Sequence, residues 1–170
     1  MAITKIQSES LNLSDTYDFT GTVTGAGEAN TPFFFSKSLT SSVSMSHETW
    51  TVQTNWNTPT KSTQGTLSSG IYTPGIAGTY VFYIVADIGN MADADRCFSK
   101  LEASEDGSTW SQIGATGKDM CSSGNADVAP QTTAIHTCTS STQIRASAWH
   151  EFGSARNWQN GFFSGYLLTT

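Results

Sequence analysis

The longest hydrophobic run of the chain covers residues 80–86, and two turn signals, Pro74-Gly75 and Ala77-Gly78, precede it. Seven apolar or aromatic residues without a helix-capping signal predict a β-strand. Side chains alternate across a strand, so both faces of this strand are apolar. We therefore expect both faces to be covered, one by the protein's own core and the other by a second copy of the chain. One face carries Tyr80, Phe82, Ile84 and Ala86, and the other carries Val81, Tyr83 and Val85.

Shorter strand patterns separated by turns continue from residue 31 to the end. Apolar and polar residues alternate within residues 50–56 and 97–103, and Asp106-Gly107 predicts a hairpin turn. No window has helical periodicity, which predicts an all-β fold, namely a sandwich, jelly roll or barrel. Further strands are expected at residues 33–35, 110–113, 132–138, 143–150 and 162–168, with 132–138 and 143–150 forming a pair.

Residues 1–30 have a different pattern from the rest of the chain. Scattered apolar residues lead into a Gly- and Thr-rich tract at residues 19–27 that offers little to bury. We predict an extended N-terminal arm that attaches to an outside surface, followed by a single domain at residues 31–170. The apolar residues expected to make the attachment are Ile3, Ile6, Leu11, Leu13 and Phe19.

The charge of the chain limits its partners. Its net charge is −6, its pI is about 4.8, and its eight basic residues are scattered singly, which argues against nucleic acid. No secretory signal or stretch of 18 apolar residues is visible, so we expect synthesis in the cytoplasm without membrane insertion. Cys97, Cys121 and Cys138 are odd in number and widely spaced, which predicts free thiols.

Catalytic motifs are absent from the sequence. His47-Glu48 and His150-Glu151 are adjacent pairs, and neighbours on a strand point to opposite faces, so neither makes a ready acid–base dyad. Nucleophile-elbow, zinc-protease and phosphate-loop motifs do not occur. We therefore expect a protein that is not an enzyme and needs no cofactor.

Two groups of residues are candidates for metal binding. We expect Asp87, Asp93 and Asp95 to lie in one oxygen-rich loop, which suits calcium, although acidic residues in loops are usually only solvated. His136 and Cys138 share a strand face and could hold zinc, but no third ligand is visible, and a packed His beside a buried Cys is the simpler interpretation.

Five tryptophans supply candidate recognition surfaces. Trp149 and Trp158 flank a polar stretch, and an exposed loop with aromatic and arginine side chains suits ligand binding. The alternative is that these rings only close the core or a subunit boundary. The candidate ligand loop comprises His150, Arg156 and Trp158.

The order of several short motifs resembles the tumour necrosis factor and complement-globular-head superfamily of trimeric jelly rolls, in the versions found in capsid and tail proteins of bacterial viruses. The motifs span residues 31–170, and Tyr72-Thr73-Pro74 followed by Ala77-Gly78-Thr79-Tyr80 is the most specific of them. The others are the aromatic residues 33–35, Trp50-Thr51-Val52, Thr142-Gln143-Ile144-Arg145 before Trp149, and Phe163-Ser164-Gly165-Tyr166-Leu167.

This resemblance implies a homotrimer that binds through its loops or outer face, with no catalytic residues to carry over. The residues expected at the core or the threefold interface are Phe33, Phe35, Val81, Tyr83, Val85, Phe163 and Leu167. The expected role is a capsid decoration or cement protein of a virion, anchored on capsid proteins by its arm.

Two other roles stay open at the level of sequence. The trimer could form the tip of a tail or neck fibre that binds a host-surface glycan. Asp106-Gly107-Ser108-Thr109-Trp110 is also similar to a hairpin of discoidin-type sandwiches, which favours a carbohydrate-binding module. Such a module would need neither a trimer nor an arm.

Overall fold

The computed structural model describes residues 33–37, 41–56, 61–62 and 65–170. The predicted N-terminal arm, with its attachment residues Ile3, Ile6, Leu11, Leu13 and Phe19, lies outside these residues. The described residues form strands and turns without a helix, so no helix that could cross a membrane is found among them. The all-β prediction is confirmed.

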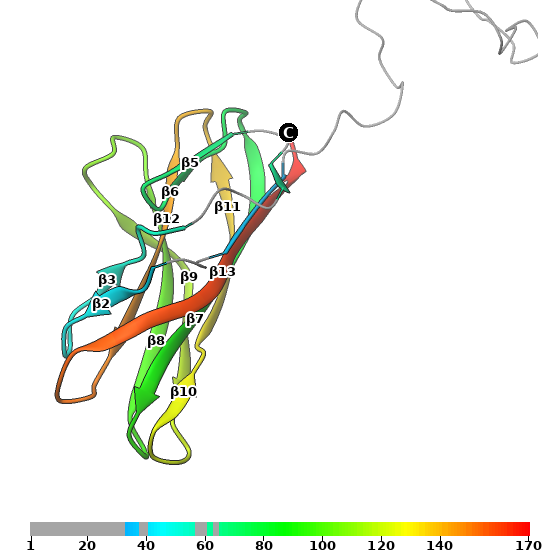
Figure 1. Ribbon diagram of the computed structural model, residues 1–170. Coiled ribbons are helices and arrows are strands. Elements are labelled where there is room, and N and C mark those ends of the chain that lie inside the picture. The colour runs from blue at the N-terminus through cyan, green and yellow to red at the C-terminus, as the bar shows by residue number, and fades with distance from the viewer. Residues whose placement is uncertain (1–32, 38–40, 57–60, 63–64) are drawn as a thin grey trace, which may run out of the picture.

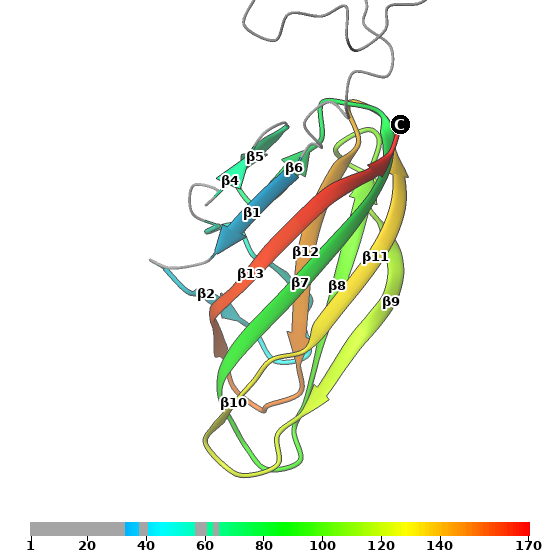
Figure 2. The ribbon, with the colours of Figure 1, turned by 90° about the vertical axis from the view of Figure 1, so that its right-hand side faces the viewer.

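Two antiparallel sheets face each other (Figures 1 and 2). We call them sheet A and sheet B. In sheet A the strands run in the order β10-β7-β13-β1-β4, with β11 also paired to β7 and β2 to β13. In sheet B they run in the order β5-β6-β12-β8-β9, with β3 also paired to β12. The strands of sheet A are β1 (Phe33–Lys37), β2 (Val43–Met45), β4 (Lys61–Ser62), β7 (Gly78–Met91), β10 (Ala126–Val128), β11 (Gln131–Cys138) and β13 (Arg156–Thr169). Those of sheet B are β3 (Thr51–Val52), β5 (Thr66–Ser68), β6 (Ile71–Thr73), β8 (Arg96–Ser104), β9 (Ser111–Met120) and β12 (Gln143–His150).

The antiparallel pair β7–β13 forms the centre of sheet A, and Figure 2 shows the two long strands side by side. The predicted strand at residues 80–86 is real and extends to Met91. Its faces divide as expected, because Tyr80, Phe82 and Ile84 are fully buried between the sheets.

The core is built from aromatic side chains of both sheets. Tyr80 and Phe82 stack with their ring centroids 5.7 Å apart, and Tyr72 of β6 meets Phe82 edge-on. Trp158 of β13 meets Trp56 edge-on at 5.7 Å. The Tyr72–Phe82 contact joins the two sheets, and burying apolar area in this way holds a sandwich together.

The structure corrects the predicted pairing of residues 132–138 with 143–150. Both segments are strands, but β11 pairs with β7 in sheet A, whereas β12 pairs with β8 and β6 in sheet B. The connection at residues 139–142 therefore crosses between the sheets. Within it, the Thr142 hydroxyl accepts a hydrogen bond from the Thr139 amide at 2.7 Å, which tightens the turn.

The alternating stretch at residues 50–56 is also shorter in the structure than in the prediction. Only Thr51–Val52 is a strand, paired with Ala148 and Ser147 of β12. The Gln53 side chain is fully buried, and its Oε1 accepts a hydrogen bond from the Asn55 amide. Trp56 then turns into the core.

Candidate assembly face and ligand sites

The outer face of sheet A carries a row of apolar side chains. Val81, Tyr83 and Val85 of β7 point away from the sandwich core and are only half-buried. A sheet that is wet on its outer face normally presents polar residues there. These three residues are therefore an exception that calls for a covering surface.

Neighbouring strands widen this row into a patch. Tyr166 of β13 and Ile135 of β11 lie directly opposite Val81 in the registers of their strands, so the three side chains share a face. Tyr166 is 46% exposed and Ile135 is 66% exposed. We define the assembly face as Val81, Tyr83, Val85, Ile135, Phe162 and Tyr166.

Aromatic and polar contacts fix the centre of the assembly face. The rings of Tyr83 and Phe162 lie 5.3 Å apart, and the Tyr83 hydroxyl donates a hydrogen bond to Oε1 of Gln131. Two half-exposed rings are thus held in place within one chain. A patch that is already ordered loses less conformational entropy when a partner covers it.

The remaining residues predicted for the core or the threefold interface lie in β13 and in β1. Phe163 is fully buried in the core, and Leu167 packs against the core while partly buried. Phe33 and Phe35 lie in β1, where they register opposite Tyr166 and Ser164. Their side chains lie outside the described part of the structure.

The prediction that His150 and Trp158 belong to an exposed ligand loop is wrong. Both side chains are fully buried. Nε2 of His150 donates to the carbonyl of Met45 at 3.1 Å, and Nε1 of Trp158 donates to the carbonyl of Asn160 at 2.9 Å. Strand β13 begins at Arg156, so Trp158 lies within a paired strand and turns inward.

Arg156 is half-buried beside this core. Its guanidinium lies 3.3 Å from the ring centroid of Phe152, which is a cation–π contact, and Nη1 donates to the carbonyl of Ala155. The arginine is therefore held by local contacts and does not extend into solvent as a ligand-binding loop residue would.

The acidic candidates for calcium do not form one loop. Asp87 lies in β7, whereas Asp93 and Asp95 lie in the turn before β8. Burial and the nearby carboxylate of Asp127 raise the pKa of Asp87. Within the described ranges, no group of three or more His, Cys, Asp or Glu side chains is placed to hold a metal.

His136 and Cys138 lie on the inner side of β11, as the shared face predicts. Burial and, secondarily, the charge of Glu105 raise the pKa of the Cys138 thiol to about 12. A thiol must lose its proton to bind zinc, so this environment favours a packed, protonated cysteine.

A second cluster, on the outer face of sheet B, was missed by sequence reasoning. The Glu102 carboxylate is buried and accepts from Ser147 at 2.6 Å, Lys100 at 2.9 Å and Arg145 at 3.0 Å. Strand alternation puts Lys100 and Glu102 on one face, but their partners on β12 depend on register, which the local pattern does not reveal.

Two tryptophans extend this cluster to both sides. The Lys100 ammonium lies 4.4 Å from the ring centroid of Trp50, and the Arg145 guanidinium lies 4.0 Å from that of Trp110. Trp50 is 39% exposed. The outer face of sheet B therefore presents rigidly held aromatic and cationic side chains.

Comparison with solved structures identifies the architecture. The globular domain of zebrafish complement 1qA has a TM-score of 0.58 at 14% identity, and 82% of this chain and 98% of that chain are covered. The fold is a jelly roll like those of complement globular heads and tumour necrosis factors. The Eiger TNF of S. frugiperda has a TM-score of 0.58 at 16% identity, covering 81% of this chain and 93% of that one. Murine APRIL has a TM-score of 0.57 at 10% identity, covering 82% and 100%.

The resemblance drawn from short motifs is thus confirmed at the level of the fold. No family model and no curated protein matches the sequence. At these identities the jelly roll shows the architecture, and function has to be argued from the surfaces of this chain.

Proposed function

We propose that this protein is a homotrimeric, non-catalytic virion component that decorates or cements the capsid of a bacterial virus. The observation that carries the trimer is the assembly face, which exposes Tyr166 and Ile135 beside the half-buried row Val81, Tyr83 and Val85. The capsid role extends the resemblance of the sequence motifs to proteins of bacterial viruses. Contiguous apolar patches on a soluble protein mark surfaces that a partner covers. The jelly-roll fold supports a second copy of the chain as that partner.

The chemistry of the proposed assembly is non-covalent and needs no cofactor. Burying apolar area contributes about 25 cal/mol per Å², so aromatic and branched residues on one face can hold subunits together. The three thiols are buried and unpaired. Attachment to the shell is assigned to the arm at residues 1–30, which carries the apolar residues Ile3 and Phe19.

The trimer is tested by measuring mass in solution. Sedimentation equilibrium of the wild type should give three times the chain mass of 18.2 kDa. Ile135→Glu should release folded monomers, because it puts a charge in the assembly face at an exposed position. Ala115→Glu, on the exposed part of β9, is the matched control and should leave the mass unchanged. A monomeric wild type would contradict the proposal.

The cement role has its own test. A chain lacking residues 1–30 should remain trimeric but should no longer co-sediment with capsid shells. If the shortened trimer still binds shells, attachment by the arm is wrong even though the trimer stands.

The fibre-tip alternative rests on the outer face of sheet B. Exposed Trp50 beside Lys100 is a surface on which a sugar ring can stack. Under this alternative a glycan array should show binding that Trp50→Ala removes, while mass and fold are unchanged. The same binding by a monomeric wild type would favour a free carbohydrate-binding module.

A further inference from the structure

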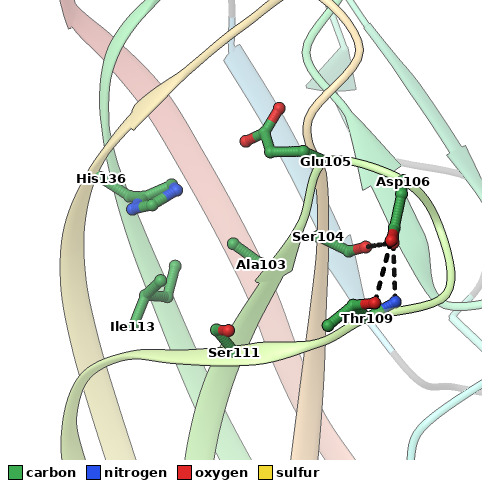
Figure 3. A pocket seen from close by; sticks show the side chains of 8 residues that line it. All are labelled: Ala103, Ser104, Glu105, Asp106, Thr109, Ser111, Ile113 and His136. Atoms are coloured by element: carbon green, nitrogen blue, oxygen red, sulfur yellow. Dashed lines mark hydrogen bonds between the residues drawn. The ribbon is translucent and has the colours of Figure 1, made fainter.

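A cavity of about 320 Å³ lies at the end of the sandwich where β8 turns into β9 (Figure 3). It opens between the first residues of β9 and the inner side of β11. None of its lining residues belongs to the assembly face. The cavity is therefore formed within one chain and does not depend on the proposed trimer.

The floor of the cavity is apolar. Ala103 of β8 and Ile113 of β9 line it, and each is only 7% exposed. A volume of this size, with an apolar floor and polar side chains around it, can hold a small ligand. The ligand therefore needs an apolar part that can lie against these two side chains.

Glu105, from the turn after β8, and His136, from β11, reach the cavity from different parts of the fold. Figure 3 shows the Glu105 side chain extending from the β8–β9 turn toward the side where His136 projects from β11. The Glu105 carboxylate accepts from the Thr142 hydroxyl at 2.7 Å and from the Thr139 hydroxyl at 3.0 Å. These bonds fix the position of the carboxylate before any ligand arrives.

The charge at the cavity is negative and is not neutralised within the described residues. Asp106 also lines it and accepts hydrogen bonds from the Thr109 and Ser108 amides, which hold the pKa of Asp106 well below its usual range. Of the ion pairs found in the described part of the chain, none involves Glu105 or Asp106. Two carboxylates at one mouth create a potential that attracts cations.

We propose that this cavity binds a small organic cation with an apolar body, namely an alkylammonium or guanidinium group. The cationic head donates to Glu105, and its carbon skeleton lies on Ala103 and Ile113. The imidazole of His136 lines the same cavity and adds a polar ring to its wall. The cation could be a free amine or a basic side chain of another protein, since the chemistry is the same.

The test titrates benzylammonium into the full chain and follows binding by calorimetry and by NMR shifts of His136. Saturable binding is expected, and benzyl alcohol, which has the same ring without the charge, should bind at least about tenfold more weakly. Equal binding of the alcohol, or no binding of the amine, would overturn the proposal.

Three variants test whether benzylammonium binds in this cavity. Glu105→Gln keeps the size of an exposed side chain and should weaken benzylammonium about tenfold, because it removes the charge that pairs with the cation. Glu48→Gln makes the same change at the opposite end of the sandwich and should have no effect. Ser111→Phe, from an exposed lining position, should block the cavity. Unchanged binding in Glu105→Gln or Ser111→Phe would refute this location.

A pair of capped peptides distinguishes the two sources of the cation. If acetyl-Ala-Lys-Ala-amide binds and its Nζ-acetylated form does not, a basic side chain of a protein fits the cavity. If benzylammonium binds and neither peptide does, the ligand is a free amine. Both results support an organic-cation site, and both stand whether or not the protein is a trimer.

Discussion

Glu102 shows how one buried charge can be accommodated on a sheet. Burial raises its pKa, but the hydrogen bonds from Ser147, Lys100 and Arg145 outweigh burial, and the net pKa lies below the ordinary value of 4.5. A lowered pKa in the folded state means that the ionised carboxylate stabilises the fold. That stabilisation is complete above the ordinary pKa and is lost as the pH falls through the lower, folded-state value.

We therefore expect Glu102→Gln to lower the free energy of unfolding by about 2 kcal/mol at neutral pH, because Lys100 and Arg145 lose their counter-charge. The measurement is urea unfolding followed by circular dichroism. The difference from wild type should shrink as the pH drops below the ordinary glutamate range. Glu48→Gln, an exposed control, should stay within about 0.5 kcal/mol of wild type. A deficit that persists in acid would contradict the assigned charge effect.

The cysteines give a second prediction at the residue scale. Burial, followed by the charges of Asp119 and Asp95, raises the pKa of the Cys97 thiol to about 12, and Cys138 is raised equally. Cys121 is also buried. Ellman's reagent should therefore react slowly with the folded protein and rapidly with all three thiols in guanidinium chloride. Rapid reaction of one thiol in the folded state would mean that its site opens.

At the element scale, the β7–β13 pair depends on a close backbone approach at Gly161. This residue has φ of 127° and registers opposite Ala86. A Cβ atom at Gly161 would lie 2.1 Å from the carbonyl oxygen of Val85, which no real contact allows. Only glycine satisfies both the backbone conformation and the spacing.

Gly161→Ala should therefore destabilise the protein by more than about 2 kcal/mol, since it combines backbone strain with a clash against the partner strand. Urea unfolding measures the change. Gly153→Ala is the matched control, because a Cβ there meets nothing within 4 Å. Equal stability of the two variants would show that β13 can shift away from β7 at little cost.

Individual strands of this molecule could be predicted, but their partners could not. The alternation in residues 97–103 puts Leu101 and Lys100 on opposite faces of β8, and in the structure Leu101 faces the core while Lys100 is only partly buried. The same reasoning paired residues 132–138 with 143–150, because short connections usually join neighbours. The chain instead crosses from sheet A to sheet B at residues 139–142. The alternation of residues within a strand does not reveal which sheet the next strand joins.

For the candidate sites, too, the sequence predicts the face of a strand on which a residue lies but not which residues come together. Val81, Tyr83 and Val85 could be assigned to a common face from sequence, because the period of a strand is fixed. The polar residues before Trp158 predict a loop there, whereas in the structure Trp158 pairs with Ile88 and Val43 and its side chain is buried in the core. Glu105 and His136 meet at one cavity only because β8 and β11 come together in the sandwich.

At the scale of the whole molecule, covering the assembly face should couple folding to association. A protein that unfolds to monomers from a trimer becomes more stable as its concentration rises. We expect the thermal midpoint of the wild type to increase with protein concentration and that of Ile135→Glu to be constant. Differential scanning calorimetry over a broad concentration range measures both. A wild-type midpoint independent of concentration would contradict assembly through this face.

The sequence by itself determined the all-β class, the position of the main strands and the two apolar faces of β7. These properties are local, since they follow from side-chain alternation and turn residues a few positions apart. Only the tertiary structure decided which strands are neighbours, that Trp158 is buried, and that Glu105 lines a cavity with His136. Those properties depend on contacts between residues far apart in the chain, and the global packing of two sheets selects them.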